Sequence, residues 1–295
     1  MDKQTLSNYG WLVIVTLILA VMLALATPFG EYVGNGVVSV VNGFIGSSNQ
    51  AMDDDNIGSM SNIWNEKLNG IYIDMSTVSS TLADNDWSTI QKVVRTGKIA
   101  EAGWKVGDTK TLTINGTTKT ATIIGIDHDG ENTATFMITE VGGIGVRVMN
   151  SVSTNIGGWE TSEIRTWLNG DVYDSMTDVA PYIKSVTKMT NNIGYNGNSV
   201  SDTSDKVFLL SPKEIGVEWQ ITGHWAMPDY VGMDALNTEG TIYKWFADGG
   251  KILDWFWLRS PISNGNNYFF SYDNGNLDCK NADYEDTVCP AFVIG

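Results

Sequence analysis

Residues 108–141, "DTKTLTINGTTKTATIIGIDHDGENTATFMITEV", alternate threonine with apolar side chains and contain two turn dipeptides, Asn115-Gly116 and Asp129-Gly130. Alternation with a period of two is typical of β-strands. Asn-Gly or Asp-Gly between such runs is the strongest short-range signal for a hairpin. The stretch therefore predicts three consecutive antiparallel strands.

The composition supports a folded, mainly β protein around this stretch. The chain has 295 residues, of which 42% are apolar and 11% aromatic, enough for one large core or two modest ones. Its 31 glycines favour turns, short strands and ordered loops over a helical bundle. The net charge of −16 repels nucleic-acid phosphates, so nucleic acid is excluded as a partner.

The N-terminal part has a different character. Residues 9–30, "YGWLVIVTLILAVMLALATPFG", carry no charge and lie between Lys3 and Glu31. About 20 apolar residues suffice to cross a bilayer as a helix, and Lys3 places the N-terminus on the cytoplasmic side. A cleaved signal peptide is the alternative, because residues 24–26 (Ala-Leu-Ala) offer a small-x-small pattern. Both interpretations export the rest of the chain.

A second apolar stripe follows in residues 31–46. Its large side chains recur at spacings of three and four, which places them on one face of a helix: Val33, Val37, Val40, Val41 and Phe44. A membrane anchor does not need this stripe, whereas a subunit that packs helix against helix does. Residues 1–46 are therefore predicted to form a hydrophobic helix that spans the membrane or lies in a filament core.

The dipeptide Tyr9-Gly10, the apolar stretch to Ala26, Gly30 and the Val/Phe face to Phe44 together resemble the short pilins of tight-adherence (type IVc) pili. The resemblance implies that copies of the chain insert into the membrane during export and then assemble into a helical homo-oligomer. Assembly contacts are then expected at Tyr9, Trp11, Ile18, Val37, Val41 and Phe44. A single-pass membrane-anchored or secreted protein without assembly is the alternative.

Residues 47–96 are predicted to be a linker and accessory segment, with a helix that begins at Asp86 or Ser88. Further along, "WETSEIRTWLNG" predicts a short amphipathic helix with a Thr/Ser cap ahead of Glu163 and an end at Gly170. Buried strands are expected at residues 207–210, in "KILDWFWLRSP" and in "VCPAFVIG".

The ordered series "WETSEIRTWLNGDVYDSM", "DKVFLLSPKEIG", "WFWLRSP" and "PAFVI" resembles a bacterial domain family of unassigned function related to the C-type lectin fold and to the formylglycine-generating enzyme fold. The resemblance covers residues 97–295 and implies a C-type-lectin-like domain there. In several members of that fold, the segment between the "WLRSP" and "PAF" landmarks is rewritten by diversity-generating retroelements, which mutate template adenines.

The corresponding segment here, residues 263–286, contains six Asn, four Asp, three Tyr, two Ser and two Gly. Adenine-directed mutation yields these residue types, and the same types dominate evolved binding loops, because Tyr gives rigid contacts and Ser, Asn and Gly adapt their hydrogen bonds. Ordinary turns of a Gly-rich β protein are the alternative. The predicted ligand-binding residues are Asn264, Asn266, Asn267, Tyr268, Ser271, Tyr272, Asn274, Asn276, Asp278, Asn281 and Tyr284.

Two further segments, "EWQITGHWAMPDYVGMDAL" and "TIYKWFADGG", are candidates for the lining of a pocket beside this polar run. The run itself lies between two apolar strands, so we expect a long loop or an irregular hairpin held by the core. Replacing Tyr268, Tyr272 and Tyr284 by Ala is then expected to leave folding intact and to abolish ligand capture.

The sequence offers little for catalysis. Cys279 and Cys289 are the only cysteines and are either a disulfide or two free thiols. His128 and His224 are far apart in turn-like contexts, and no Ser/His/Asp, P-loop or His-Glu-x-x-His pattern is present. The acidic stretches "DDDN" and "IDHDGEN" do not match calcium-loop spacing and are interpreted as solvated loops. No metal, cofactor or enzymatic activity is predicted.

The expected fold class is α+β: a long N-terminal hydrophobic helix followed by a mainly β, loop-rich C-type-lectin-like domain. The expected function is a cell-surface, pilin-like filament subunit that displays a ligand-binding domain for an unidentified protein or glycan. A formylglycine-generating-like enzyme is the remaining alternative.

Overall fold

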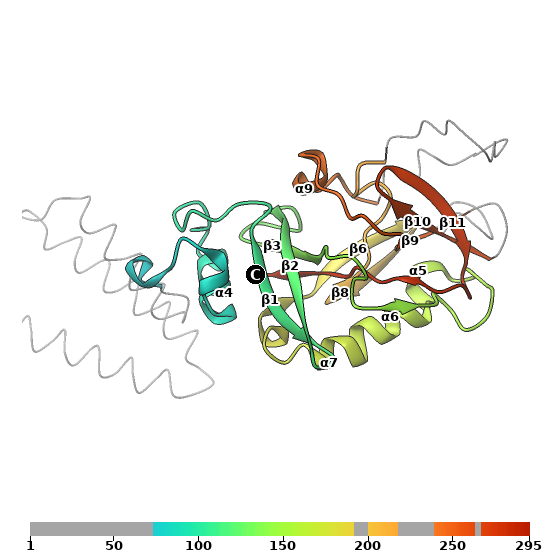
Figure 1. The fold of residues 1–295 in the computed structure, drawn as a ribbon, viewed down its shortest axis with the longest axis horizontal. Coiled ribbons are helices and arrows are strands. Elements are labelled where there is room, and N and C mark those ends of the chain that lie inside the picture. The colour runs from blue at the N-terminus through green and yellow to red at the C-terminus, as the bar shows by residue number, and fades with distance from the viewer. Residues whose placement is uncertain (1–72, 192–199, 218–238, 263–266) are drawn as a thin grey trace, which may run out of the picture. The chain divides into compact units, whose positions relative to one another are not determined.

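The computed structural model describes residues 73–191, 200–217, 239–262 and 267–295. The chain divides into two compact units, Met1–Ile73 and Asp74–Gly295, of which the second holds the described elements (Figure 1). Its strands are β1 Thr109–Ile114, β2 Thr117–Ile126, β3 Ala134–Ile138, β4 Val146–Arg147, β5 Ile183–Lys184, β6 Val186–Asn191, β7 Val200–Asp205, β8 Val207–Phe208, β9 Phe256–Pro261, β10 Tyr268–Asp273, β11 Asn276–Asn281, β12 Asp286–Thr287 and β13 Ala291–Ile294. Its helical segments are η1 Met75–Thr77, η2 Leu82–Asp84, α4 Trp87–Arg95, α5 Gly158–Thr161, α6 Glu163–Trp167, η3 Leu168–Val172, α7 Tyr173–Ser175, η4 Ala180–Tyr182 and α9 Lys244–Ala247.

The first sheet contains the three strands of residues 108–141, β1, β2 and β3. Its order is β1-β2-β3-β13-β5, and β8 also pairs with β13. The β1–β2 hairpin turns at Asn115 and Gly116, whose φ angles of 50° and 73° are both in the left-handed region that a type I′ turn requires. The three predicted antiparallel strands are therefore confirmed. The last strand, β13, lies inside the sheet and pairs with β3 on one side and with β5 and β8 on the other.

Helix α4 packs against this sheet through one aromatic side chain. The Trp87 ring meets the rings of Phe136 and Phe292 edge-on, at centroid distances of 5.2 and 6.0 Å. The Asp86 carboxylate accepts a hydrogen bond from the Thr89 N–H and caps the helix, as predicted. The predicted apolar face of the helix is buried: Ile90, Val93 and Val94.

The second sheet has the order β11-β10-β9-β12-β4. All its pairs are antiparallel except β9–β12. A separate two-stranded sheet is formed by β6 and β7. The β10–β11 hairpin lies at the end of the domain opposite to α4 (Figure 1).

The short helices are held to the strands by buried polar groups. Asp205 is fully buried and its carboxylate accepts hydrogen bonds from Trp159 Nε1 at 2.9 Å and from Arg165 Nε at 2.6 Å. The Asn169 side chain accepts from the backbone N–H of Val207 and donates to its carbonyl, as a neighbouring strand would. The helical path does not end at Gly170 as predicted, because a wide turn, η3, carries it on to α7.

The predicted fold class was wrong in its helical part. Within the described ranges, no helix is long and apolar enough to cross a membrane. The longest helix there, α4, has nine residues, which extend about 14 Å, against a bilayer core of about 30 Å. Residues 1–46, for which the long helix was predicted, lie outside the described residues. The described domain consists mainly of β-strands and connecting segments with short helices.

Candidate functional site

Residues 268–281 of the polar run form the β10–β11 hairpin, which is regularly paired where a long loop or an irregular hairpin was expected. The closing pair is Asp273 with Asn276. Between them, Asn274 and Gly275 have φ angles of 41° and 101°. Two successive left-handed residues define a type I′ turn, for which Asn-Gly is the preferred sequence. The run is therefore an ordered hairpin whose tip projects polar side chains.

The predicted ligand-binding residues differ in exposure. Those that face solvent are Asn267, Asn274, Asn276, Asp278 and Tyr284, the last 61% exposed. Tyr268 and Asn281 are half-buried. Asn264 and Asn266 lie outside the described residues. The hairpin thus offers exposed amide, carboxylate and phenol groups of the kind that adaptable binding surfaces use.

Two of the predicted residues have buried side chains, and one of them, Tyr272, also lines the cavity described below. The Ser271 hydroxyl is buried and donates to the Asp286 carboxylate. Tyr272 is 9% exposed, and its ring meets that of Phe256 edge-on at 5.8 Å. Strand alternation explains both positions, because β10 is covered on its two faces and its neighbours β9 and β11 hydrogen-bond to its sides.

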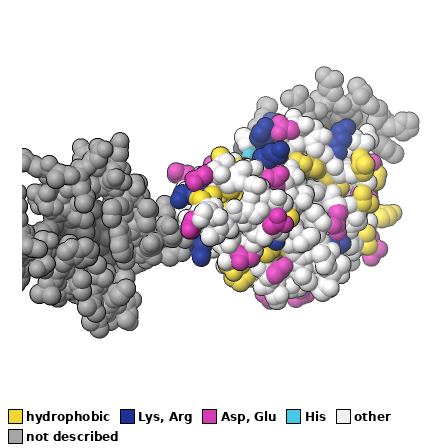
Figure 2. All heavy atoms as spheres, turned by 60° about the vertical axis from the view of Figure 1, so that its left-hand side comes forward, with side chains coloured by type: hydrophobic (Ala, Val, Ile, Leu, Met, Phe, Trp, Pro, Cys, Tyr) yellow, Lys and Arg dark blue, Asp and Glu magenta, His cyan; other side chains and the backbone are white. Residues whose placement is uncertain are grey.

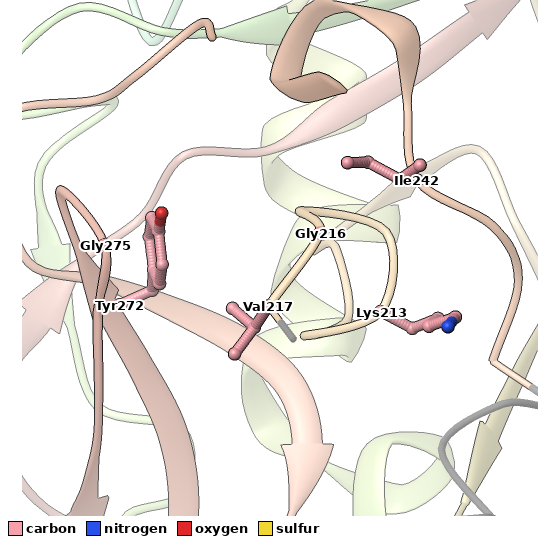
Figure 3. Close-up of a pocket in the computed structure, with 6 residues that line it drawn as sticks. All are labelled: Lys213, Gly216, Val217, Ile242, Tyr272 and Gly275. Atoms are coloured by element: carbon pink, nitrogen blue, oxygen red, sulfur yellow. The ribbon is translucent and has the colours of Figure 1, made fainter. Parts of the chain in front are cut away.

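A cavity of about 380 Å³ lies beside the hairpin. Its lining comes from three segments that are distant in sequence: Lys213, Gly216, Val217, Ile242, Tyr272 and Gly275. Figure 3 shows the Tyr272 ring on one side and Val217 and Ile242 on the other, with the Lys213 amino group pointing away from Tyr272. The volume is within the range of about 300–1,000 Å³ that is usual for small-molecule sites.

Two glycines shape this cavity. Gly216 has a φ of +74°, and a Cβ atom there would lie 2.2 Å from Cδ1 of Ile242, so only glycine allows the two segments to approach this closely. Gly275 has a φ of +101°, and a Cβ there would meet nothing within 4 Å. One glycine therefore brings two walls together, while the other forms the turn beside open space.

The wall formed by residues 213–217 is anchored from beneath by Glu214. Its buried carboxylate pairs with the guanidinium of Arg259 and with Lys188 Nζ at 3.1 Å. It also accepts a hydrogen bond from the Ser211 N–H at 3.0 Å. Burial alone would raise the pKa of Glu214, but the charges of Arg259 and Lys188 outweigh burial and hold that pKa below its usual value.

The neighbouring segment at Ile242, on the same side of the cavity, is tied to the same cluster. The backbone N–H of Tyr243, next to Ile242, donates to the Glu214 carbonyl at 2.9 Å. The Tyr243 hydroxyl lies between Lys188 Nζ at 2.8 Å and the Asp129 carboxylate at 2.7 Å. Burial, followed by the charges of Glu214 and Asp129, raises the pKa of Tyr243 well above its usual value, so this hydroxyl stays protonated. The charged groups Asp129, Lys188, Glu214 and Arg259 together with Tyr243 are called the ionic cluster below.

His128 covers the outer side of this cluster. Its ring stacks on that of Tyr243 at a centroid distance of 3.8 Å. Burial lowers the pKa of His128, although Asp129 and Glu214 act in the opposite direction. His128 is thereby held neutral near pH 7 in a packed position. His224, the other histidine, lies outside the described residues.

Sequence reasoning missed the ionic cluster. Arg259 lies within the apolar strand β9 and Glu214 follows the apolar strand β8, and both side chains are almost fully buried. One charge of each sign inside two apolar segments is a signal for a buried pair, since buried charges must be paired. The landmarks "SPKEIG" and "WLRSP" therefore describe a structural contact between two segments of the chain.

The two cysteines do not form the disulfide considered from the sequence. Both are free: Cys279 is half-buried on β11, and Cys289 is fully buried before β13. Burial, together with the carboxylates Asp254 and Asp286, raises the pKa of Cys289 far above its usual value, so this thiol is protonated and unreactive.

Of the two acidic stretches, the structure describes only one, the loop "IDHDGEN". In the loop "IDHDGEN", Asp129 is bound to Lys188 Nζ at 2.6 Å and Asp127 accepts from the Thr133 N–H. Across the described ranges, no group of three or more His, Cys, Asp or Glu side chains is placed to hold a metal ion. The other acidic loop, residues 53–56, and the assembly residues predicted between Tyr9 and Phe44 lie outside the described residues.

On the face drawn in Figure 2, most of the described surface is backbone or uncharged side chains outside the hydrophobic class, and acidic side chains are spread over it. The fold and cavity thus define a β-rich domain with a small, partly apolar site beside a polar hairpin.

A model of the family described as "Domain of unknown function (DUF6273)" matches residues 132–295. The match covers more than half of the chain, so the chain belongs to this family. No curated protein and no solved structure matches the chain.

Proposed function

We propose that the domain of residues 74–295 is a recognition domain that binds its ligand in the cavity and on the tip of the β10–β11 hairpin. The observation that carries the proposal is the convergence of three separate segments on a cavity of about 380 Å³, one of them the turn of the hairpin, where Asn274 and Asn276 are exposed. Concave sites with mixed apolar and polar lining are where proteins bind small groups.

Rigidity supports this proposal. The two segments on one side of the cavity, residues 213–217 and the segment at Ile242, are fastened to the ionic cluster through the Glu214 carboxylate and the Tyr243 backbone. A wall that is already fixed loses little conformational entropy when a ligand binds, which improves affinity. The cluster thus supports the site without contacting the ligand.

Chemistry also favours binding over turnover. The ionisable side chains beneath the cavity neutralise one another: Glu214 pairs with Arg259 and Lys188, and Lys188 also pairs with Asp129. General acid–base catalysis needs a group within hydrogen-bond reach of the substrate and with a pKa near the working pH. The groups that line the cavity are instead aliphatic, aromatic, glycine and one lysine.

The proposal is tested by filling the cavity. The full chain would be applied to glycan and peptide arrays, and captured ligands would then be titrated against the variant Val217→Trp. Because the indole occupies the space that the ligand needs, we expect affinity to fall by at least about tenfold.

The matched control is Val152→Trp, which places the same ring at a valine that is 61% exposed and does not line the cavity. It should bind like the wild type. Equal binding by both variants, with unchanged melting temperatures, would show that the cavity is not the recognition site.

For residues 1–46 we propose self-association into a surface filament, with attachment of single chains to a membrane as the alternative. The support is the uncharged stretch of residues 9–30 and the apolar stripe from Val33 to Phe44. Electron microscopy of the full chain tests it: filaments are expected, and Val37→Asp with Val41→Asp should abolish them. Particles that remain monomeric after extraction would contradict filament assembly.

A further inference from the structure

Strand β11 has a free edge. In the second sheet it pairs with β10 on one side only, and no other strand in the described ranges pairs with it. Figure 1 shows it at the outer margin of the hairpin. An edge strand presents unpaired backbone N–H and C=O groups, which are a template for the addition of another strand. The six residues Asn276–Asn281 form this edge.

The turn determines which backbone groups point outward. A type I′ turn closes with a hydrogen bond between Asp273 and Asn276, and hydrogen-bonded pairs then alternate with non-bonded ones along the hairpin. In the register of β10 and β11, Leu277, Cys279 and Asn281 stand in the non-bonded pairs, so their N–H and C=O groups point away from β10. The Asn281 carbonyl already accepts a hydrogen bond from the Tyr284 N–H at 2.9 Å and keeps its second lone pair for a further donor. The Cys279 N–H agrees with this, because it donates to the Asp278 carboxylate at 2.8 Å.

These outward groups restrict how a second β11 could pair with the first. In antiparallel pairing about a two-fold axis, the outward N–H and C=O groups of one β11 must face the outward groups of the other. Leu277, Cys279 and Asn281 carry these groups, so the pairing can be centred on residue 278, 279 or 280. The register centred on 278 places Asp278 opposite its own copy, and the one centred on 280 does the same with Lys280. Both place like charges directly opposite one another, which is destabilising.

The register centred on Cys279 reverses this situation. It places Asp278 of each copy opposite Lys280 of the other, so two opposite-charge pairs form at once. It also pairs the outward groups of Cys279 with their own copies, and those of Leu277 with those of Asn281. Hydrogen-bond alternation therefore allows three registers, and charge selects the one centred on Cys279 among them.

We propose that β11 is a self-association edge: two copies of the chain pair antiparallel through β11, centred on Cys279, and join their five-stranded sheets into one. Each Asp278 exchanges its hydrogen bond to the Cys279 N–H for the Lys280 side chain of the other copy. In the single chain the same carboxylate caps the edge and limits unspecific strand addition.

This pairing has a consequence for recognition. It places two cavities in one assembly, so a ligand with two epitopes is bound twice, and the second event is intramolecular. Added salt screens the repulsion between chains of net charge −16, but it also weakens the two Asp278–Lys280 pairs, so the two effects of salt on the dimer act in opposite directions.

The test uses two charge reversals in the full chain, Asp278→Lys and Lys280→Glu. Each variant alone places like charges opposite one another in both pairs, and we expect self-association about tenfold weaker than in the wild type. A mixture of the two variants restores opposite charges in both pairs, so a heterodimer of wild-type affinity is expected. Sedimentation velocity with one variant carrying a fluorescent label measures both.

A thiol crosslink maps the contact. A short bismaleimide should join Cys279 of one chain to Cys279 of the other, because Cys289 is fully buried and protonated. The crosslink distinguishes pairing at β11 from association through residues 1–46. Near-UV circular dichroism checks that Lys280→Glu, which also loses the 2.8 Å pair with Asp286, remains folded.

The matched control is Asp283→Lys, which makes the same charge change as Asp278→Lys at an exposed position outside β11. It should leave dimerisation unchanged. The proposal is overturned if Asp283→Lys weakens dimerisation as Asp278→Lys does, or if the mixed variants do not associate. It is also overturned if wild-type chains give no Cys279 crosslink at protein concentrations that saturate the ligand on the arrays.

Discussion

The ionic cluster and the tip of the β10–β11 hairpin are both rich in polar residues, yet the structure uses them in opposite ways. In the cluster, Glu214 and Arg259 are almost fully buried and are paired within the protein. At the tip, Asn274 and Asn276 are exposed to solvent. The cluster fixes the walls of the cavity, and the tip is free to change. Whether a polar residue stabilises the fold or is available to a ligand thus depends more on its burial than on its type.

Variants of the cluster should therefore cost stability, whereas variants of the tip should not. The largest effect is expected for Arg259→Leu, which leaves the Glu214 carboxylate buried and short of its main partner. Removing one partner of a buried pair costs about 3–5 kcal/mol in the free energy of unfolding. Urea denaturation followed by tryptophan fluorescence measures the loss.

The control is Lys244→Leu, which breaks the exposed pair between Lys244 and Asp248 on α9. Exposed i,i+4 pairs contribute about 0.3–0.5 kcal/mol. Similar losses for Arg259→Leu and Lys244→Leu would remove the distinction between the cluster and the surface.

Tyr272→Ala is expected to have the next largest effect. The side chain is 9% exposed and packs against Phe256, so its removal leaves a void that costs about 3 kcal/mol. This corrects the expectation that alanine at Tyr268, Tyr272 and Tyr284 leaves folding intact. Thermal melting of Tyr272→Ala beside Tyr272→Phe separates the loss of the ring from the loss of the hydroxyl.

The pH dependence of stability offers a smaller test of the cluster. Because burial lowers the pKa of His128, the folded state disfavours its protonation. The contribution of neutral His128 is complete above its usual pKa of 6.5 and is lost as the pH falls toward the lowered value. We expect wild-type stability to decline as the pH falls below 6.5 more steeply than that of His128→Asn. Parallel curves from urea titrations would contradict the packed role of this ring.

The smallest effect is expected at Asn276, beside the turn, and at Tyr284, which follows β11 at the other end of the hairpin. Tyr284→Ala and Asn276→Ala remove exposed side chains and should change the free energy of unfolding by less than about 0.5 kcal/mol. Each should nevertheless reduce ligand capture on the arrays. A loss of stability like that of Tyr272→Ala would mean that these positions are part of the scaffold.

Local signals predicted the local structure well. The Asn115-Gly116 hairpin and the α4 cap at Asp86 follow from neighbouring residues, and both are present. The helix after Trp159 was predicted to end at Gly170 but continues, because the Asn169 side chain holds the wide turn against Val207. A glycine does not end a helix where tertiary contacts stabilise helical backbone beyond it, as they do after Gly170.

The cavity was predictable only in part. The segments "EWQITGHWAMPDYVGMDAL" and "TIYKWFADGG" were expected to line a pocket beside the polar run; Ile242 of the second does line the cavity, and the first lies outside the described residues. The third wall, residues 213–217, was not expected, because it reaches the cavity only through the pairing of Glu214 with Arg259 across two sheets. Contacts between segments so distant in sequence leave no periodic pattern for sequence reasoning to detect.

The central position of β13 affects how the domain is made. Strand β3 cannot pair with β13 until the 152 residues numbered 139–290 have been synthesised. Their synthesis takes about 8 to 30 seconds at ordinary rates of translation. During that time the apolar strand β3 has an open edge on the nascent chain. Chaperones that shield nascent strands should therefore raise the yield of this protein more than they raise that of domains whose sheets close early.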